Sequence, residues 1–363
     1  MVKDLVPLAA VRRALVIKLR HHGDVLLSSP VFSVLKAHAP SIEIDALVYA
    51  DTAEMLAQHP ALSQLHRIDR QWKKLGLFAQ ARAEWRLLQT LRARRYDLII
   101  HLTEHPRGAW LSRLCGARWA VAPAMRQRGR FWQSSFSHFF GKPANALRHT
   151  VERNLDALRR IGLYPEADER ALTLVAGHDA ETRVALLLRE QGVELSKRRS
   201  FIHLHPASRW HFKCWPVDNM AALIDRLQHS GQQVVLSAAP DVAEMAMIDA
   251  LQARLSQPAV SLAGQLSLKE LAALTARARL FIGVDSAPMH IAAAMGTPTV
   301  ALFGPSGDRE WGPWGVPHRV VSSDAHPCRP CGIDGCGGGK VSDCLSSLSV
   351  DRVHAAVQEL LGE

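Results

Sequence analysis

The chain has 363 residues, 48% of them hydrophobic and 21% charged, and this length predicts two domains with sizeable cores. The N-terminal sequence lacks the pattern of a signal peptide, and no apolar run approaches the roughly 20 residues of a membrane-spanning helix. Six cysteines are too few for a disulfide scaffold. These features predict a soluble cytoplasmic protein. Its net charge of +10 favours acidic partners, whether nucleic acid, an anionic membrane face or a phosphorylated substrate, or it only maintains solubility.

Strand and helix signals alternate along the chain. In the first half, strands are predicted at 14–19, 42–48, 97–102 and 119–122, and helices at 31–38, 52–58, 78–94 and 151–162. In the second half, strands are predicted at 201–205, 233–237, 258–262, 279–284 and 298–303, and helices at 217–229, 241–255, 267–276, 287–295 and 350–362. This alternation predicts an α/β fold in which each half forms a Rossmann-like, doubly wound parallel sheet.

A polar stretch between the halves, LYPEADERA, is the candidate linker. We therefore place the first domain at residues 1–165 and the second at 166–349. Residues 350–363 form a last amphipathic helix, which we expect to pack back toward the first domain. Two similar α/β halves imply a cleft between them.

The first candidate site is the segment RHHGDVLLSSP, which follows the first predicted strand. Asp24 would lie at the carboxyl end of that strand, where open α/β sheets bind ligands, and Gly23 allows the chain to bend. The alternative is that Asp24 only caps a helix. That helix would begin either at Asp24, with a kink at Pro30, or at Ser29, with Pro30 in its first turn.

The second candidate site is the loop HPASRWHFKCWP, which follows the first strand of the second half. Ser208, Arg209 and Lys213 could present hydroxyl, guanidinium and ammonium groups to a phosphate. The alternative is an ordinary loop with solvated charges. His203 and His205 share one face of the strand, where hydrogen-bonded structural histidines are commoner than metal ligands.

The third candidate site is the segment FIGVDSAPMHIAAAMG. A buried strand would end at Asp285, and Ser286 and Ala287 would open a helix of small residues that includes His290. The N-terminus of such a helix offers backbone N–H groups and a partial positive charge to an anion. Close packing explains the alanines but does not explain the aspartate, serine and histidine at the helix start.

Two further features remain open. Basic residues gather at Arg70, Lys73 and Lys74, along the helix at 78–94, and at Arg126, Arg128 and Arg130. The apolar spacing of that helix suits a crossover helix with a charged outer face, or a helix lying on an anionic membrane. Nucleic-acid binding is disfavoured because no recognised module accompanies the charge. Four clustered cysteines, Cys328, Cys331, Cys336 and Cys344, contain a single CxxC pair and match a zinc site only in part.

Three segments taken together resemble the lipopolysaccharide heptosyltransferases: LVIKLRHHGDVLLSSPVFSVLK, HPASRWHFKCWP and LFIGVDSAPMHIAAAMGTPTVALFGPS. The resemblance covers the chain from about residue 12 to its end, with the motifs in the family's order. The segments RHHGD and FKCW are most similar to those of the heptosyltransferase III branch, which adds the third, side-chain heptose to the inner core.

The resemblance implies a glycosyltransferase B fold that transfers heptose from ADP-L-glycero-D-manno-heptose to lipopolysaccharide core, at the cytoplasmic face of the inner membrane and without a cofactor or a metal. By position, Asp24 matches the general base and Lys213 the phosphate-binding lysine. Asp285 matches the acid that contacts the sugar, and Ser286, Ala287 and His290 match the diphosphate-binding helix start. Ser208 and Arg209 fall where hydroxyl residues often touch the phosphates, and Arg209 departs from that pattern.

The resemblance also implies a nucleoside site. Asp241 or Glu244 would contact the ribose, and the backbone near Leu266 would meet adenine. The basic residues near 70–95 and 126–130, among them Arg70, Lys73 and Lys74, could hold the carboxylates and phosphates of the inner core, and the apolar stripe of the helix at 78–94 could touch lipid. The alternatives are heptosyltransferase I or II activity on an earlier acceptor, a nucleotide-sugar epimerase of the same architecture, and a non-enzymatic polyanion-binding protein.

The expected chemistry explains why a single acid follows the first strand. In an inverting displacement ADP leaves as an anion, so one carboxylate suffices, whereas glycosidases usually need two. An aspartate with a pKa near ~3.9 is a weak base that accepts the proton late in the attack. Fixed cations in the second half would stabilise the charge that grows on the diphosphate, in place of a divalent metal.

Overall fold

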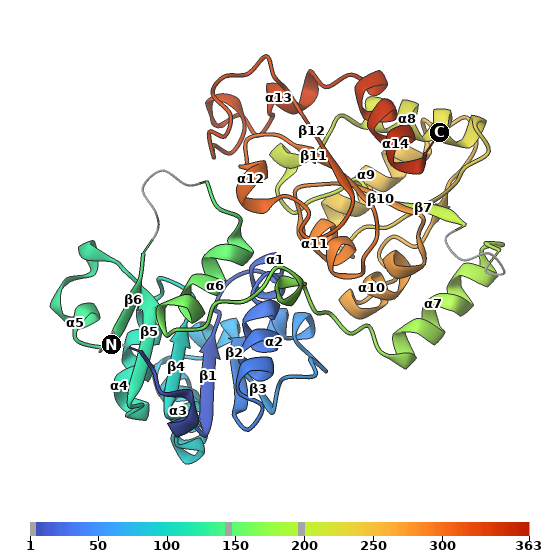
Figure 1. Ribbon diagram of the computed structural model, residues 1–363. Coiled ribbons are helices and arrows are strands. Elements are labelled where there is room, and N and C mark those ends of the chain that lie inside the picture. The colour runs from blue at the N-terminus through green and yellow to red at the C-terminus, as the bar shows by residue number, and fades with distance from the viewer. Residues whose placement is uncertain (1–4, 142–146, 195–199, 363) are drawn as a thin grey trace. The chain divides into compact units, whose positions relative to one another are not determined.

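The computed structural model describes residues 5–141, 147–194 and 200–362, and it divides into two compact units between Thr173 and Leu174 (Figure 1). The sequence analysis places this boundary earlier, at residue 165. The difference arises because the predicted linker is tied to the first unit: Glu169 accepts a hydrogen bond of 2.9 Å from His38, and Arg170 donates one of 3.1 Å to Glu152.

The first unit is built on a six-stranded parallel sheet in the order β3-β2-β1-β4-β5-β6. Its strands are β1 (Arg13–Ile17), β2 (Glu43–Tyr49), β3 (Gln64–Ile68), β4 (Leu98–His101), β5 (Trp119–Pro123) and β6 (His138–Phe140). Its α-helices are α1 (His22–Leu26), α2 (Ser29–His38), α3 (Leu77–Arg94), α4 (Pro106–Cys115), α5 (Gly129–Gln133) and α6 (Thr150–Arg160). Short 3-10 helices lie at η1 (Leu8–Ala10), η2 (Ala50–Met55), η3 (Arg70–Lys74), η4 (Arg126–Arg128) and η5 (Asp168–Arg170).

The second unit repeats this topology in a parallel sheet of the order β12-β11-β10-β7-β8-β9. Its strands are β7 (Phe201–His205), β8 (Gln233–Leu236), β9 (Val260–Ser261), β10 (Leu280–Val284), β11 (Thr299–Phe303) and β12 (His318–Ser322). Its helices are α7 (His178–Glu190), η6 (His211–Lys213), α8 (Val217–His229), α9 (Val242–Gln252), α10 (Leu268–Arg277), α11 (Ala287–Ala294), α12 (Asp308–Trp311), η7 (Cys336–Gly338), α13 (Asp343–Ser346) and α14 (Val350–Leu361). In both sheets the first and fourth strands are neighbours, so the winding direction reverses between β1 and β4 and between β7 and β10.

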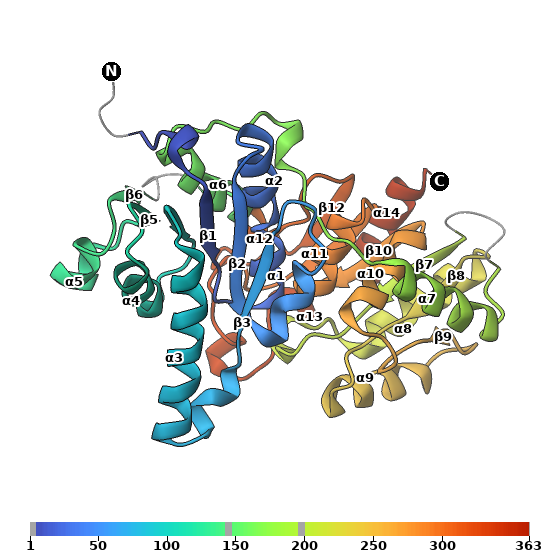
Figure 2. The same ribbon diagram turned by 90° about the horizontal axis from the view of Figure 1, so that it is seen from below.

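Helices flank each sheet (Figures 1 and 2). In the first unit, α2 contacts α6 and α3 contacts α4, and the core between β1 and the α3–α4 pair contains Leu15, Ile17 and Leu91. Because side chains alternate along a strand, the next polar residue after β1, Lys18, faces the α6 side instead. The two sheets confirm the predicted doubly wound α/β class.

The C-terminal helix belongs to the core of the second unit. Val353 and Val357 of α14 are fully buried there, and α14 contacts α8, β11 and β12. The apolar face of α14 covers the β11–β12 side of the second sheet, and the predicted packing of this helix toward the first domain stays a prediction.

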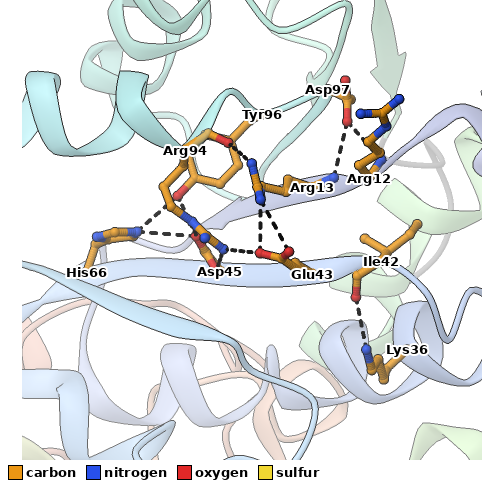
Figure 3. Close-up of polar contacts among 10 residues, drawn as sticks. All are labelled: Arg12, Arg13, Lys36, Ile42, Glu43, Asp45, His66, Arg94, Tyr96 and Asp97. Atoms are coloured by element: carbon orange, nitrogen blue, oxygen red, sulfur yellow. Dashed lines mark hydrogen bonds and ion pairs between the residues drawn. The ribbon is translucent and has the colours of Figure 1, made fainter.

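A buried polar network connects the C-terminal end of α3 to the first sheet (Figure 3). Asp45 of β2 is fully buried and accepts hydrogen bonds from Arg94 Nε at 2.7 Å and from Tyr96 Oη at 2.7 Å. Arg94 also donates to Glu43 at 2.7 Å, and His66 Nε2 lies 3.5 Å from Asp45. Burial raises the pKa of Asp45, but the hydrogen bonds from His66, Arg94 and Tyr96 outweigh burial, and the net pKa is lowered.

Replacing Arg94 with methionine would leave the Asp45 carboxylate buried without its ion-pair partner. We expect the free energy of unfolding to fall by about 3 kcal/mol at pH 7, the lower end for a broken buried pair, because Arg94 remains 18% exposed. Since the folded-state pKa of Asp45 is lowered, its stabilisation exists above the unfolded pKa and is lost as pH falls through the folded pKa. The effect of Arg94→Met should therefore shrink in acid, as measured by urea unfolding.

A control and a double variant test the interpretation. Arg319 pairs with Glu359 on the surface, with both side chains about half exposed, so Arg319→Met should change stability little. The double variant Asp45→Asn/Arg94→Met should be more stable than Arg94→Met alone, because no lone charge stays buried. A double variant that loses the sum of both single effects would contradict this account.

Candidate active site

The first unit places Asp24 at the carboxyl end of β1, inside the first turn of the short helix α1. Asp24 is 9% exposed, and Arg20 Nε lies 3.6 Å from its carboxylate. Residue 24 caps neither helix, because the N-cap of α1 is His21 and that of α2 is Ser28. The capping interpretation is therefore wrong, and Pro30 lies in the first turn of α2, as the second alternative for this helix has it.

A buried lysine that the sequence analysis does not name stands beside this acid. Lys18 Nζ donates to Asn154 Oδ1 at 2.9 Å and to the carbonyl of Leu102 at 3.4 Å. Asn154 Nδ2 in turn donates to the carbonyl of Leu27 at 2.9 Å. Burial lowers the pKa of Lys18 to about 8, and the negative charge of Asp24 opposes that fall. The only sequence signal for this group is a lysine at the end of an otherwise apolar strand.

Arg70, a predicted acceptor-binding residue, braces the segment that leads to Asp24. Its Nε lies 3.1 Å from both carboxylate oxygens of Asp51, and its Nη2 donates to the carbonyl of Arg20 at 3.0 Å. The guanidinium also stacks on Tyr49, 3.7 Å from the ring centroid. Arg70 thus holds η2, η3 and the loop after β1 together.

Basic side chains that are far apart in the sequence meet around His105, at the start of α4. The pKa of His105 is lowered first by burial and then by the positive charges of Arg107, Lys73 and Arg128. The His105 ring accepts a hydrogen bond of 3.1 Å from the backbone N–H of Arg107 and so caps α4. The charges of both predicted basic segments thus act on one histidine, together with that of Arg107, which is not among the predicted residues.

The remaining acceptor candidates lie on the surface of the first unit. Lys74 and Arg130 are exposed, in η3 and α5 respectively. The guanidinium of Arg128 lies 6.0 Å from the centroid of the Trp132 ring. The side chain of Arg126 lies outside the described part of the structure.

In the second unit, an ion pair spans the two strands at which the winding reverses. Lys213, on η6 after β7, lies 2.6 Å from the carboxylate of Asp285, which directly follows β10. Asp285 is 7% exposed, and the Lys213 side chain is 21% exposed. In open α/β sheets this switch point is where ligands bind. The second and third candidate segments are thus joined by a direct contact.

The helix start after Asp285 has the geometry of an anion site. Ser286 is the N-cap of α11, Ala287 begins the helix, and Ser286 makes no side-chain cap hydrogen bond to it. Pro288 has no N–H and the N–H of Met289 donates to the carbonyl of Ser286 at 3.2 Å, so the N–H of Ala287 is the one at this helix start that could meet an anion. His290 lies one turn further along and is buried.

The loop after β7 places its two predicted phosphate residues differently. Ser208 is buried, and its hydroxyl accepts a hydrogen bond of 3.2 Å from the backbone N–H of Trp210. Arg209 is exposed, with its guanidinium 5.0 Å from the centroid of the Trp210 ring. The position at which Arg209 departs from the family pattern is therefore at the protein surface.

The two carboxylates after β8 have different surroundings. Asp241 caps α9 by accepting hydrogen bonds from the backbone N–H groups of Ala243 at 2.9 Å and Glu244 at 3.3 Å. Glu244 is buried, and it accepts a hydrogen bond of 2.9 Å from the backbone N–H of Ala239. Leu266 is half-buried in the loop before α10.

The strand histidines are hydrogen-bonded structural residues. His203 Nε2 lies 2.7 Å and His205 Nδ1 lies 2.9 Å from the hydroxyl of Ser237. The hydroxyl of Thr275 lies 2.9 Å from His203 Nδ1. Burial lowers the pKa of His205 to about 4, so the ring is neutral at physiological pH. In the residues that the structure describes, no three His, Cys, Asp or Glu side chains are grouped to hold a metal ion.

The six cysteines are all free thiols and fall into two groups. Cys115 and Cys214 are partly buried, and burial raises the pKa of each thiol to about 11. In the C-terminal loop, Cys344 is buried and burial raises the pKa of its thiol, whereas Cys328, Cys331 and Cys336 are exposed.

Comparison with known proteins supports this arrangement. Residues 84–341 match the family described as glycosyltransferase family 9 (heptosyltransferase). The chain is 38% identical over 299 residues to lipopolysaccharide heptosyltransferase 3 of Escherichia coli K12, covering 82% of this chain and 83% of that protein. The family 9 glycosyl transferase structure from Veillonella parvula has a TM-score of 0.81 at 22% identity, covering 96% of this chain and 97% of that one. The E. coli heptosyltransferase WaaC with ADP has a TM-score of 0.74 at 21% identity, covering 96% and 99%.

The structural likeness confirms the glycosyltransferase B fold class that the resemblance implied. The family match includes the α3–α4 region, the linker and the whole donor-side motif from Ser208 to His290. Together with the identity to a curated relative over most of the chain, it shows that this protein belongs to glycosyltransferase family 9, the heptosyltransferases, and is a glycosyltransferase.

Proposed function

We propose that this enzyme transfers L-glycero-D-manno-heptose from ADP-heptose to the inner core of lipopolysaccharide, with inversion at the anomeric carbon, and that it adds the third, side-chain heptose. The observation that carries the proposal is that each sheet presents one reactive constellation at its own switch point. In the first unit this is Asp24, and in the second it is the Lys213–Asp285 pair. The 38% identity to a heptosyltransferase 3 supports the branch.

Asp24 is the proposed general base. It would take the proton of the acceptor hydroxyl as that oxygen attacks the anomeric carbon and the bond to the diphosphate breaks. Arg20 Nε lies 3.6 Å from this carboxylate and the charge of Lys18 interacts with it, so both cations would orient it. Base catalysis of this kind is typically worth roughly 10²–10⁴-fold.

The second unit is the proposed donor site. Lys213 and the N-terminus of α11 at Ser286 and Ala287 would stabilise the charge that develops on the leaving ADP. Asp285 would hold Lys213 in place and contact the sugar, and His290 would stand behind the helix start. Because these groups are fixed before the reaction, the proposal needs no cofactor.

The proposed contacts to the ribose and the adenine come from loops that follow the strands of the second unit. Glu244 is the better candidate for the ribose, since its carboxylate faces the loop after β8 whereas that of Asp241 is engaged in capping α9. The backbone N–H of Gly264 donates to the carbonyl of Ala238 at 2.9 Å, which places the loop that leads to Leu266 beside the end of β8. That loop would receive the adenine. Ser208 and Arg209 would flank the phosphates.

The basic cluster around His105 is the proposed acceptor site for the anionic inner core. Lys73, Arg107 and Arg128 converge there, and Lys74, Arg126 and Arg130 would extend it. Within the described ranges, no helix is both long enough and apolar enough to cross a bilayer. We infer peripheral association with the cytoplasmic face of the inner membrane, where the lipid-linked acceptor is exposed, and no role for nucleic acid.

The family match favours transfer over epimerisation, and the higher identity to heptosyltransferase 3 than to heptosyltransferases 1 and 2 favours the third-heptose branch. A nucleotide-sugar epimerase would convert ADP-heptose without an acceptor, and a heptosyltransferase I or II would use an earlier acceptor. Incubating the donor with and without truncated cores, followed by mass spectrometry of the products, tests both alternatives. Loss of the side-chain heptose from cells that lack the protein would establish the branch.

Replacing Asp24 with asparagine removes the proposed base and keeps the shape of the side chain. We expect kcat for heptose transfer to fall by about 10²–10⁴-fold, with ADP affinity changed less than twofold. Mass spectrometry of the product and calorimetry with ADP measure the two quantities. Glu54→Gln, an exposed carboxylate on η2, is the control and should leave both unchanged. Near-normal turnover of Asp24→Asn would refute the mechanism.

Lys18 predicts an alkaline limit to activity. As pH rises through about 8, Lys18 loses its proton and with it the positive charge beside Asp24, so kcat/KM should decline. Burial is the main cause of the lowered pKa of Lys18. The charged groups that also act on it are Asp24, which raises the pKa, and Arg20 and Arg153, which lower it. Lys18→Arg stays charged and should move this limit to higher pH, whereas Lys18→Met should be weakly active at every pH.

The pH–rate profile separates this positioning role from a purely structural one. Melting temperatures identify any variant of Lys18 that fails to fold. If Lys18→Arg is folded and active but keeps the wild-type alkaline limit, another group is responsible.

Reversing charge at Lys73 and Arg128 together should raise the KM for the core acceptor at least tenfold, because both cations act at the same histidine. ADP affinity should not change, since both residues belong to the first unit. Arg183→Glu, on the exposed face of α7 in the second unit, is the matched control. Equal losses of acceptor and ADP binding would contradict the assignment.

A further inference from the structure

Helix α3 has an apolar face that the fold does not use. Its buried residues are Leu87, Leu88 and Leu91. Phe78 and Trp85 are 94% and 57% exposed, and they lie seven residues apart, within about 20° of each other around the helix axis. At about 100° per residue, Leu87 and Leu91 lie roughly 160° and 120° from Trp85 around the axis, and Leu88 lies roughly 60° from it. The two aromatic side chains therefore point away from the core that anchors α3.

The same end of the molecule carries two more unburied apolar side chains. Leu75 and Leu77, at the junction of η3 and α3, are 53% and 85% exposed. Figure 2 shows that this end of α3 extends beyond the strands of the first sheet, together with the turn that precedes it. The other end is fixed through Arg94 to the buried Asp45, so the exposed end is held out on an anchored helix. We call Leu75, Leu77, Phe78 and Trp85 the α3 tip.

The charges around the α3 tip have one sign. Lys74, Arg82 and Arg86 are exposed beside it. From residue 70 to residue 95 the sequence has one acid, Glu84, and its carboxylate is paired with Arg107. A surface of exposed aromatic and aliphatic side chains, surrounded by unneutralised cations, complements an apolar layer beneath anionic headgroups.

We propose that the α3 tip docks the enzyme on an anionic lipid bilayer, with Phe78 and Trp85 inserted at the headgroup level and Arg82 and Arg86 on lipid phosphates. The proposal rests on the proposed function only in that the acceptor is lipid-linked. A second copy of the chain is a poorer occupant, since it would bring the same cations against this surface. An acidic protein partner would match the charges but would not require aromatic side chains at the end of an extended helix.

Vesicle sedimentation tests the proposal directly. The full-length protein should bind vesicles of phosphatidylglycerol and phosphatidylethanolamine, and should bind neutral phosphatidylcholine vesicles at least tenfold more weakly. Raising the salt concentration should weaken binding, because exposed charges are screened. Phe78→Ser/Trp85→Ser and, separately, Arg82→Glu/Arg86→Glu should each reduce binding to anionic vesicles at least tenfold.

The matched control is Tyr164→Ser/Leu186→Ser, which removes one exposed aromatic and one exposed aliphatic side chain outside α3. It should bind vesicles like the wild type. The proposal is overturned if the wild type ignores anionic vesicles or if Phe78→Ser/Trp85→Ser binds them normally. It is also overturned if light scattering shows a dimer that these two substitutions dissociate.

A second assay separates this proposal from the proposed function. Phe78→Ser/Trp85→Ser should transfer heptose to a deacylated core in solution at the wild-type rate, and should lose activity only toward acceptor embedded in vesicles. If the wild type binds anionic vesicles through α3 but transfers no heptose, docking stands and the proposed reaction fails. If transfer to the deacylated core is normal but the α3 variants bind vesicles like the wild type, docking alone fails.

Discussion

Reversal of the winding direction within each sheet is the constraint on which the site depends. At the switch point, the connections after two neighbouring strands run to opposite faces of the sheet. The loops after β1 and β4, and those after β7 and β10, therefore separate and leave a crevice at the carboxyl ends of these strands. In the second unit the Lys213–Asp285 ion pair bridges this gap at 2.6 Å. The same topology in the first unit sets Asp24 in the corresponding position, after the first strand. Because the topology is repeated, the proposed base and the proposed donor site lie at equivalent places in the two units.

The contacts around Asp24 hold the backbone that carries this residue in place, in addition to setting the charge beside its carboxylate. Arg70 holds the preceding carbonyl, at Arg20, while Lys18 and Asn154 tie the ends of β1 and β4 to α6 and to the turn before α2. A carboxylate on a turn of only five residues would otherwise have little to orient it. Donors placed before the reaction need no reorganisation during it, which is the physical basis of electrostatic catalysis. In the proposed mechanism Lys18 would contribute in this way, as a positioning residue beside Asp24.

The central strands and the motif residues are predictable from the sequence. The edge strands, and the residues that only the tertiary fold brings near the site, are not. β1, β4, β7, β10 and β11 are rich in apolar residues, and the predicted ranges match them within about two residues. β3 (QLHRI) and β6 (HFF) lie at or near sheet edges and have too few apolar residues to give a strand signal, and β12 was likewise not predicted. The predicted helix at 52–58 is a 3-10 helix over Ala50–Met55, and the predicted strand at 258–262 shortens to Val260–Ser261. Asp24, Lys213 and Asp285 belong to local sequence motifs and can be recognised from them. Lys18 and Arg107 can be recognised as part of the site only from their neighbours in the folded structure.

The burial of two cysteines has a practical consequence. With their pKa values near 11, the thiols of Cys115 and Cys214 are almost entirely protonated at neutral pH, and the protonated thiol is a poor nucleophile. The thiols of Cys328, Cys331 and Cys336 are exposed to solvent. Maleimide dyes should therefore attach selectively to the C-terminal loop, which gives a fluorescent reporter on the second unit in an enzyme whose other cysteines need not be removed.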